Sequence, residues 1–462
     1  MADRTMSESG QERLSFYKRA AAITAPIALQ NFMDAAVSSA DVIMLSFVSQ
    51  TALAASSLAG QIAFVQQMLL YGISSGASVL SAQYWGKGDR RAVERVLGLS
   101  LRVTLIISTC LTLAAALAPS LLMRIFTNDS DLIAAGRDYL RTVSISYLLG
   151  GFCSVYLSVM RSVERVRVSA AVHCGAVILN VLLNACFIFG LGPFPSLGIV
   201  GVAMATSITR LLEFIVCQID GRMCRIIRLR LSDILARGGQ LMRDFTHYSI
   251  PAAANDVVWG MAFSVYSVIL GHLSSDIVAA NSVASVVRNL ATVVCFGVSS
   301  SAAIMLGKMM GEGRLDYARV CARRFVWLSV WTAVAGGVLI LLCRPFVLQF
   351  MHYYVTVTDT VRSELNTMLY INSYYVIGQS VNTMLICGIF RAGGDVRFGL
   401  HCDIIAMWGY AVPVGLLCAF VFKLPEMIVY FILCLDEFVK MPVNFLHYRK
   451  RGWLCNITRD LE

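Results

Sequence analysis

The chain repeats itself after 225 residues. Residues 46–88 align without a gap with residues 271–313, so YGISSGASVLSAQYWGKG is matched by FGVSSSAAIMLGKMMGEG. The repeated positions are mostly small: Ala54, Ala55, Gly72, Ser74, Ser75, Gly86 and Gly88 match Ala279, Ala280, Gly297, Ser299, Ser300, Gly311 and Gly313, and Pro26 matches Pro251. Solenoid repeats have periods of about 20–50 residues. A period this long instead predicts two related halves, an organisation typical of membrane transporters whose binding site lies between or inside the halves.

Composition shows that water is not the main solvent of this chain. Its 462 residues are 57% hydrophobic and 14% charged, whereas soluble domains carry about 25% charged residues. Apolar runs of at least the ~20 residues that cross a bilayer core occur at 20–48, 52–82, 94–126, 131–163, 168–190 and 198–222, and again at 244–273, 276–309, 317–350, 358–390, 398–421 and 425–448. We therefore expect an all-α polytopic membrane protein with twelve transmembrane helices in two pseudo-twofold-related six-helix bundles.

Charge placement predicts the topology. Of the 38 Lys and Arg residues, 28 lie at the N-terminus, in alternate loops and in the tail, and about six lie in the opposite loops. By the positive-inside rule, both termini are expected in the cytoplasm of a multi-pass plasma membrane protein, such as one of the bacterial cytoplasmic membrane. The expected parts are an N-lobe at 1–222, a cytoplasmic amphipathic linker at 223–243, and a C-lobe with a short cytoplasmic tail at 244–462. The basic residues behind the net charge of +10 are thus expected at the cytoplasmic surface of the lipid bilayer. They indicate no nucleic-acid partner.

Two sequence motifs are absent, and their absence argues against a metal site and against ATP as the energy source. The fourteen cysteines form no CxxC motif and no paired Cys/His spacing, so we read them as small apolar residues and expect no metal site. No GxxxxGK[ST] nucleotide loop occurs. The energy source is therefore expected to be an ion gradient, and no cofactor is expected besides H⁺ or Na⁺ as the coupling ion.

The first half carries polar side chains inside two expected spans. They are Gln30, Asp34, Ser38 and Asp41 on one face of the first helix, and His173, Asn180 and Asn184 on one face of the fifth. Carboxylates and carboxamides supply oxygen ligands for a hard cation, and a carboxylate removed from water also exchanges protons more readily near neutral pH. This pattern predicts a hydrated proton or sodium site. The alternative is a polar seam that holds helices together.

The second half has its own polar and aromatic set. The candidate substrate-binding residues are Asp256, Trp259, Tyr266, Tyr374, Tyr375, Gln379, Arg288 and Asp403. An aromatic pocket with an acidic group suits an organic cation, although ordinary apolar packing also explains such aromatics. Arg288 is also a possible structural ion-pair partner for Asp256 or Asp403. Asp436 and Lys440, at i and i+4 of the last span, are spaced to form a pair.

Several segments resemble the multidrug and toxic compound extrusion (MATE) transporters, over nearly the whole chain. They are Pro26 followed by Asp41 in SADVIMLS and then LAASSLAGQ, GKGD at 86–89, GEGR at 311–314, ILNVLLNACFIFG with LGIVGVAMAT, and IFRAGGD at 389–395. Their order, spacing and twofold occurrence carry the resemblance. It implies two six-helix lobes, outward- and inward-facing states, and export of cationic or amphipathic organic compounds such as drugs and toxins in exchange for H⁺ or Na⁺.

The resemblance also implies residue roles. Asp41 matches the acid of the family's first helix, Asn180 the carboxamide of the fifth, and Thr206 the hydroxyl of the sixth. Asn184 stands where the family often has a second acid, and Asp34 is a candidate to supply that charge. In the C-lobe, the acids of other members fall at Trp259 and Ser380, which argues against a sodium site there.

Other functions fit less well. A flippase for lipid-linked oligosaccharides, from the same superfamily, needs a cationic central cavity for a pyrophosphate, whereas the charges expected inside these spans are mainly acidic. An enzyme is not expected, because no HExxH motif and no clustered Ser/His/Asp set occurs. Twelve helices in a doubled bundle do not suggest a receptor. We expect a monomeric transporter of small organic substrates.

The topology is testable by cysteine accessibility. On a background depleted of cysteine, Gly239→Cys in the linker is expected to react with membrane-permeant reagents only, because the linker is basic and should face the cytoplasm. Labelling of intact cells with permeant and impermeant maleimides measures this. Reaction of Gly239→Cys with an impermeant maleimide from outside would place the linker outside the cell and contradict the predicted topology.

Overall fold

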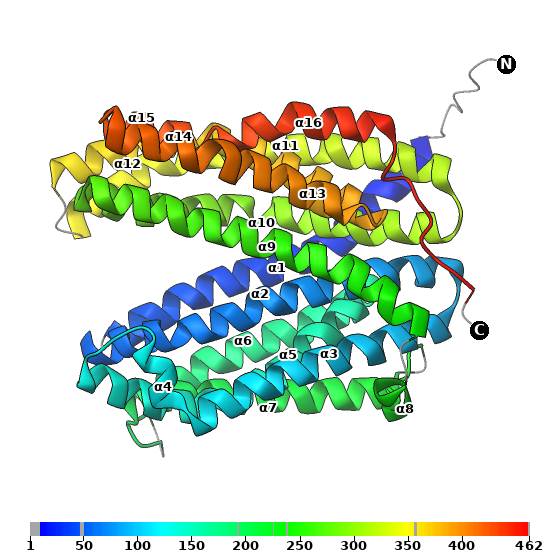
Figure 1. Cartoon of the computed structure of the whole chain (residues 1–462), viewed down its shortest axis with the longest axis horizontal. Helices are drawn as coiled ribbons and strands as arrows, with labels where there is room; N and C mark the ends of the chain where they lie inside the picture. The colour runs from blue at the N-terminus through cyan, green and yellow to red at the C-terminus, as the bar shows by residue number, and fades with distance from the viewer. Residues whose placement is uncertain are drawn as a thin grey trace.

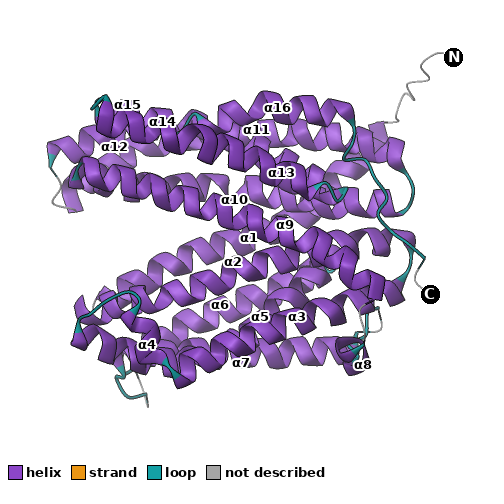
Figure 2. Ribbon diagram, viewed as in Figure 1, coloured by secondary structure: helices purple, strands orange, loops and turns teal. Residues whose placement is uncertain are grey.

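The protein consists of two helical bundles, which lie one above the other in Figure 1. The computed structural model describes residues 10–46, 50–191, 194–224, 226–236, 239–354 and 358–460, without the side chains of residues 10, 38–43, 45, 46, 50, 53 and 352–354. Within these ranges almost every residue is helical and no strand occurs (Figure 2). Nine helices of the described part are long and apolar enough to span a membrane.

The helices follow the expected order. The first bundle contains α1 (Gly10–Ser46), α2 (Gln50–Lys87), α3 (Arg90–Leu117), α4 (Pro119–Arg124), α5 (Ser130–Ser162), α6 (Val166–Phe189) and α7 (Gly198–Met223). The second contains α9 (Gly239–Leu273), α10 (Ser275–Gly311), α11 (Leu315–Tyr354), α12 (Asp359–Thr383), η1 (Met384–Phe390), α13 (Val396–Asp403), η2 (Ile404–Ala411), α14 (Val412–Leu416), η3 (Leu417–Val421), α15 (Glu426–Leu433) and α16 (Asp436–Lys450). Joining segments that continue one another gives six crossings in each half, so the predicted twelve-helix, two-bundle fold is confirmed.

Three late crossings are not uniform α-helices. The segments η1, η2 and η3 are π-helical, and a turn at Cys434 and Leu435 separates α15 from α16. The first bundle shows one break, where Pro119 starts α4 directly after α3. π-Helical turns often occur near functional sites, and here they lie in the lobe that holds the cavity described below.

The short turns explain two of the repeated glycines. After α2 the chain turns at Gly88, with φ of +84°, and after α10 it turns at Gly313, with φ of +76°. Only glycine adopts this left-handed region at no steric cost. Asp89 then accepts a hydrogen bond from the Ala92 backbone N at 2.9 Å and caps α3. The GKGD sequence therefore encodes a helix end followed directly by a helix start.

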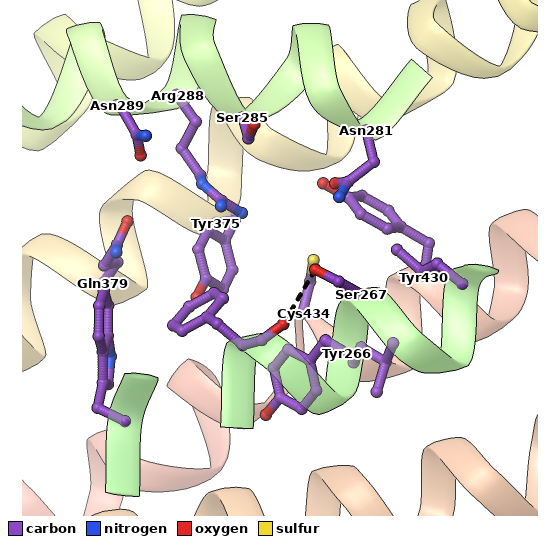
Figure 3. Close-up of a pocket in the computed structure, with 14 residues that line it drawn as sticks. Tyr266, Ser267, Asn281, Ser285, Arg288, Asn289, Tyr375, Gln379, Tyr430 and Cys434 are labelled. Carbon is purple, nitrogen blue, oxygen red and sulfur yellow. Dashed lines mark hydrogen bonds between the residues drawn. The ribbon is translucent and has the colours of Figure 1, made fainter. Parts of the chain in front are cut away.

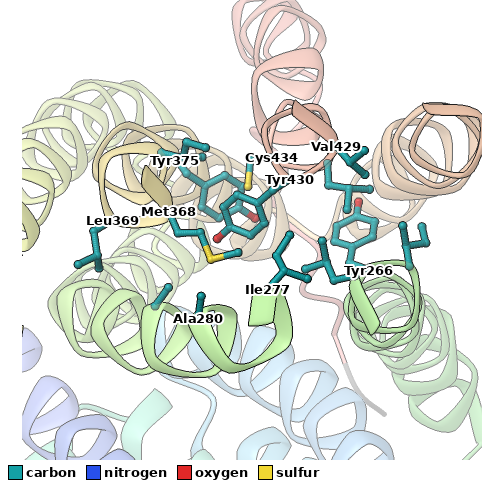
Figure 4. Packing of buried hydrophobic residues seen from close by; sticks show 14 of the residues in the cluster. Tyr266, Ile277, Ala280, Met368, Leu369, Tyr375, Val429, Tyr430 and Cys434 are labelled. Carbon is teal, nitrogen blue, oxygen red and sulfur yellow. The ribbon is translucent and has the colours of Figure 1, made fainter. Parts of the chain in front are cut away.

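Each bundle has a close-packed apolar interior. In the C-lobe, Figure 4 shows Tyr375 and Met368 of α12 packed against Tyr430 of α15, with Ile277 of α10 and Tyr266 of α9 nearby. Lipid is as apolar as these side chains, so their association depends on tight packing more than on the exclusion of water. The rings that build this core also form the walls of a cavity.

The expected linker at 223–243 is divided in the structure. Only Leu231–Leu235 (α8) forms a separate short helix, and α9 already begins at Gly239. Asp233 of α8 is buried and accepts two hydrogen bonds at 2.9 Å from Arg91 of α3. The segment is thus attached to the N-lobe through an ion pair.

The two lobes contact each other at glycines that occupy equivalent positions in the repeat. Gly72 of α2 lies against Ala253 of α9, leaving no room for a β-carbon at Gly72, and a β-carbon at Gly297 of α10 would lie 3.2 Å from that of Ala28 of α1. Residues 28 and 253 are themselves 225 positions apart, as are residues 72 and 297. Each contact is therefore the symmetry mate of the other.

A second reciprocal pair lies nearer the turns. Gly86 approaches the Lys308 carbonyl, and Gly311 approaches the Gln83 carbonyl, again with the 225-residue offset between equivalent partners. At both sites a side chain in place of the glycine would meet backbone. The small residues of the repeat thus let helices of opposite lobes touch, as small residues do in other membrane bundles.

The C-terminal tail joins the lobes at the same end of the molecule. In Figure 1 the tail runs from α16 to the lower bundle on the side where the bundles converge, whereas they spread apart on the other side. Gln83 of α2 donates to the carbonyls of Ala392 and Cys455, at 2.8 and 3.2 Å, and accepts from Ile457 N at 2.8 Å. Arg459 reaches Asp244 of α9 at 3.2 Å.

Glu164, in the turn between α5 and α6, binds a basic side chain from each lobe. Its Oε2 lies 2.7 Å from Lys308 Nζ of α10, and its Oε1 contacts Arg19 of α1. Burial raises the pKa of the Glu164 carboxyl, but hydrogen bonds from Lys308 and Arg19 outweigh burial, and the net pKa is lowered. A lowered folded-state pKa keeps this link intact at neutral pH and weakens it only as the pH falls through that pKa.

A disulfide should trap this arrangement of the lobes. Ala28→Cys combined with Gly297→Cys is expected to cross-link on a cysteine-free background, because the two β-carbons come close to the ~3.5–4.5 Å spacing of disulfides. Loss of maleimide-PEG labelling measures the cross-link. Ala28→Cys with Leu290→Cys, about 10 Å away along α10, serves as the control. Equal cross-linking of both pairs would contradict the described crossing.

Candidate functional site

The predicted cation site of the N-lobe is partly assembled. Asn180 of α6 donates to Thr206 Oγ1 of α7 at 3.5 Å, and Asn184 donates to Asn180 Oδ1 at 3.3 Å. Thr206 in turn donates to the Val202 carbonyl at 3.0 Å. Three of the expected oxygen-bearing residues therefore meet between α6 and α7. Asp41 belongs to α1, but its side chain lies outside the described part of the structure.

A second polar cluster lies on the same face of α6, two turns earlier. His173 Nε2 lies 2.8 Å from Asp34 Oδ1 of α1, and His173 Nδ1 lies 3.7 Å from Glu213 Oε1 of α7. Glu213 Oε2 is also bound by Arg210 Nη1 at 2.6 Å. The Glu213 side chain is 1% exposed, whereas that of Asp34 is 53% exposed. One imidazole thus bridges an accessible and a buried carboxylate.

Sequence reasoning missed Glu213 and Arg210. Both stand inside the sixth expected span, where charged residues are rare and usually functional or paired. Their i, i+3 spacing places them on one face of α7, so the signal was present in the sequence. The pairing with His173 was not readable, because it depends on how α6 and α7 pack.

The acids of the C-lobe have partners other than Arg288. Asp256 of α9 accepts from Arg391 Nη2 at 2.7 Å, and the same nitrogen donates to Asn255 Oδ1 at 2.9 Å. Arg391, from the IFRAGGD segment, also reaches Ser75 of α2 at 3.3 Å. The proposed pairing of Arg288 with Asp256 is therefore not found. The actual partner approaches from the segment that follows η1.

Lys440 of α16 neutralises the buried acids on the other side of this network. It lies 3.1 Å from Asp403 Oδ1 and 3.0 Å from Glu437 Oε1, and all three side chains are at most 6% exposed. Asn255 links the two groups by donating to Asp403 Oδ2 at 2.6 Å. The expected pairing of Lys440 with Asp436 is replaced by these two contacts, and Asp436 accepts from the Tyr266 hydroxyl at 3.3 Å. A continuous polar chain thus crosses the interior of the C-lobe.

The C-lobe also holds a cavity of about 290 Å³. Of the residues predicted to bind substrate, Trp259, Tyr266, Arg288, Tyr375 and Gln379 line it. Figure 3 shows Arg288 reaching from α10 toward Tyr375 of α12, with Gln379 and Asn281 to either side. The structure therefore brings five of the eight predicted residues together around one space.

Three predicted substrate residues lie elsewhere. Tyr374 packs against Phe431 and Phe438, on the other side of α12. Asp256 and Asp403 belong to the polar chain described above. The prediction of an acidic aromatic pocket placed Asp256 among these rings, whereas the charged side chain in the cavity is Arg288.

Comparison with known proteins identifies the fold and the family. A family model described as MatE matches residues 26–186 and 251–417, one stretch in each lobe. The chain belongs to the MatE family. Members of this family are transporters, so the resemblance inferred from sequence is confirmed, as is the multi-pass membrane organisation.

The MatE relatives cover nearly the full length. YisQ, an uncharacterized transporter of Bacillus subtilis, is 21% identical over 432 residues, or 94% of each chain. NorM of Thermotoga maritima, a probable multidrug resistance protein, is 21% identical over 430 residues, covering 92% of this chain and 90% of NorM. A solved MOP-superfamily transporter from Pyrococcus furiosus shares the fold with a TM-score of 0.84 at 18% identity, over 94% of this chain and 95% of its own.

The buried charges of the C-lobe predict a large effect of one substitution. Lys440→Met is expected to destabilise the protein by about 3–5 kcal/mol, because it leaves two buried carboxylates without a counter-charge. Thermal unfolding of the purified protein in detergent measures the loss.

Two variants control for this effect. Lys450→Met, at the exposed end of the same helix, is expected to stay within about 0.5 kcal/mol of the wild type. Asp403→Asn combined with Lys440→Met should recover part of the loss, since one buried charge is removed. A wild-type melting temperature for Lys440→Met alone would show that the acids around it are not charged.

Proposed function

We propose that this chain is a secondary active antiporter that exports small amphipathic organic compounds, cations among them, in exchange for H⁺. The observation that carries the proposal is the bridge made by His173 between Asp34 and Glu213, which joins three helices of the N-lobe. Both halves of the transport unit are present in one chain, so a monomer suffices for alternating access.

Protonation of His173 would change the contacts between helices. A protonated imidazole donates from both nitrogens and can serve both carboxylates, whereas a neutral imidazole has only one donor. Loss of the proton therefore weakens one of the two contacts of His173, the one to Asp34 of α1 or the one to Glu213 of α7. Among the described side chains, Arg210 of α7 and Arg161 of α5 also face this site, and Arg161 donates to Ser169 Oγ of α6 at 3.3 Å. These cations offset part of the negative charge of the two carboxylates.

The predicted cation site supports the same proposal. Asn180 follows His173 by two helical turns, about 10 Å along α6, and faces the same way. Together with Asn184 and Thr206, it extends the polar path along the N-lobe. If Asp41 carries the family role, then Asp41→Asn should also abolish gradient-driven export.

The orientation completes the proposal. With the basic loops in the cytoplasm of a plasma membrane, the converging ends of the lobes and the C-terminal tail face inward, and the spreading ends face outward. The described state is then the outward-facing one, with the links made by Glu164 and Gln83 closing the cytoplasmic side. A lipid-linked oligosaccharide flippase is less well supported, because the cavity of about 290 Å³ is small for an oligosaccharide pyrophosphate.

Proteoliposomes test the coupling. Export of a fluorescent cation such as ethidium is expected to follow an imposed pH gradient and to ignore an imposed sodium gradient. Glu213→Gln and His173→Asn should each lower pH-driven export about tenfold or more, the size of a typical coupling free energy. Asp131→Asn, on the exposed first turn of α5, is the matched control.

Two outcomes would contradict the assignment. Export driven by sodium alone would exclude proton coupling. Wild-type export by Glu213→Gln and His173→Asn, together with loss of export in Asp256→Asn, would place coupling in the C-lobe.

A further inference from the structure

The C-lobe cavity contains one positive charge and no acidic residue in its wall. Arg288 places its guanidinium 5.6 Å from the Phe263 ring centre and 5.4 Å from that of Tyr375. Its Nε makes no hydrogen bond, and no ion pair of Arg288 is found among the residues that the structure describes. An arginine inside a membrane bundle normally pairs with a carboxylate, so this side chain has donors left for a ligand.

The nearby acids are already engaged. Asp256 binds Arg391, while Asp403 and Glu437 bind Lys440. Asp436 accepts from the Glu437 backbone N at 2.8 Å and from the hydroxyl of Tyr266, a residue that lines the cavity. The Tyr266 hydroxyl thus lies between the cavity and Asp436, and Arg288 is the charged side chain in the cavity wall that a ligand would encounter.

Neutral polar groups complete the wall. Asn281, Ser285 and Arg288 follow one another at spacings of four and three residues, which places them on one face of α10. Gln379 of α12 is 6% exposed, and its Oε1 has no hydrogen-bond partner. Between these groups lie the rings of Trp259, Phe263, Tyr266 and Tyr375. The cavity thus offers flat apolar surfaces around one guanidinium fork and several uncharged hydrogen-bonding groups.

We propose that this cavity binds small aromatic organic anions, with a carboxylate, sulfonate or phosphate at Arg288 and the ring among the surrounding aromatics. Arginine suits such groups because its planar fork donates two parallel hydrogen bonds. Ligand sites usually occupy about 300–1,000 Å³, so a cavity of about 290 Å³ accommodates one or two fused rings. Binding of the anion does not depend on the proposed export function. Only the further step, that the bound anion is transported, rests on that proposal.

Binding can be tested separately from transport. Three probes share one ring system and differ in charge: 1-naphthoate, 1-naphthylmethanol and 1-naphthylmethylammonium. The full-length purified protein is expected to bind naphthoate at least about tenfold more tightly than the ammonium, as measured by calorimetry, because only the carboxylate pairs with the guanidinium. Equal or tighter binding of the ammonium by the wild type would overturn the proposal without any variant.

Substitutions assign the effect to Arg288. Arg288→Gln should weaken naphthoate binding about tenfold or more and leave naphthylmethanol binding nearly unchanged. Arg288→Lys keeps the charge and should bind with intermediate affinity, since an ammonium lacks the planar fork. Arg344→Gln is the matched control: Arg344 also lies over a tyrosine, Tyr370, at 4.1 Å, but outside the cavity. An unchanged naphthoate affinity in a folded Arg288→Gln protein would overturn the proposal.

Lipid nanodiscs distinguish binding of a soluble anion from binding of a lipid headgroup phosphate, which has related chemistry. Naphthoate should bind equally in discs of phosphatidylcholine and in discs with added phosphatidylglycerol. Displacement by the anionic lipid would assign Arg288 to a headgroup and contradict a solute site. Because none of these measurements uses a gradient, selective naphthoate binding can hold even if proton-driven export fails, and the reverse result is equally distinguishable.

Discussion

A charge inside a membrane bundle is costly unless it finds a counter-charge or a hydrogen bond there, because hydrocarbon supplies neither. The C-lobe meets this constraint with a chain of contacts from Ser75 through Arg391, Asn255 and Asp403 to Lys440. The N-lobe meets it with one imidazole between two carboxylates. The positions of α6, α7, α9 and α16 all depend on these contacts, and any movement of a helix along a charged seam has to exchange one partner for another.

The two lobes pair their interior charges in different ways. In the N-lobe the bridging group is a histidine, whose proton content can change, and one end of the bridge, Asp34, is accessible. In the C-lobe the bridging groups are Arg391 and Lys440, which stay charged, and their carboxylate partners Asp256 and Asp403 are less exposed than Asp34. The first arrangement is suited to change during a cycle and the second to rigidity. The cavity in the C-lobe, with Arg288 in its wall, is therefore expected to keep a constant shape if the N-lobe changes its contacts.

Much of the architecture was predictable from sequence, but the pairings were not. Twelve apolar runs and a 225-residue repeat specify twelve helices in two lobes, since span length and helix number follow from the thickness of the bilayer. The glycines of the repeat lie at the contacts between the lobes, a role that sequence reasoning did not assign to them. The partner of Asp256 was not predictable, because Arg288 and Arg391 are both single arginines near apolar spans, and only helix packing decides which one reaches Asp256. Helix packing also explains why Tyr375 lines the cavity whereas its sequence neighbour Tyr374 lies outside it.

The reciprocal contacts at Gly72 and Gly297 have the geometry of a homodimer interface, in which residue i of one copy meets residue j of the other and the reverse also holds. An ancestor of half this length, with six crossings and both ends on one side of the membrane, could have formed this interface between two identical copies. Joining two such copies in one gene removes the requirement that both carry the same residues. Each half was then free to specialise, and the histidine of one lobe and the arginine of the other record that freedom.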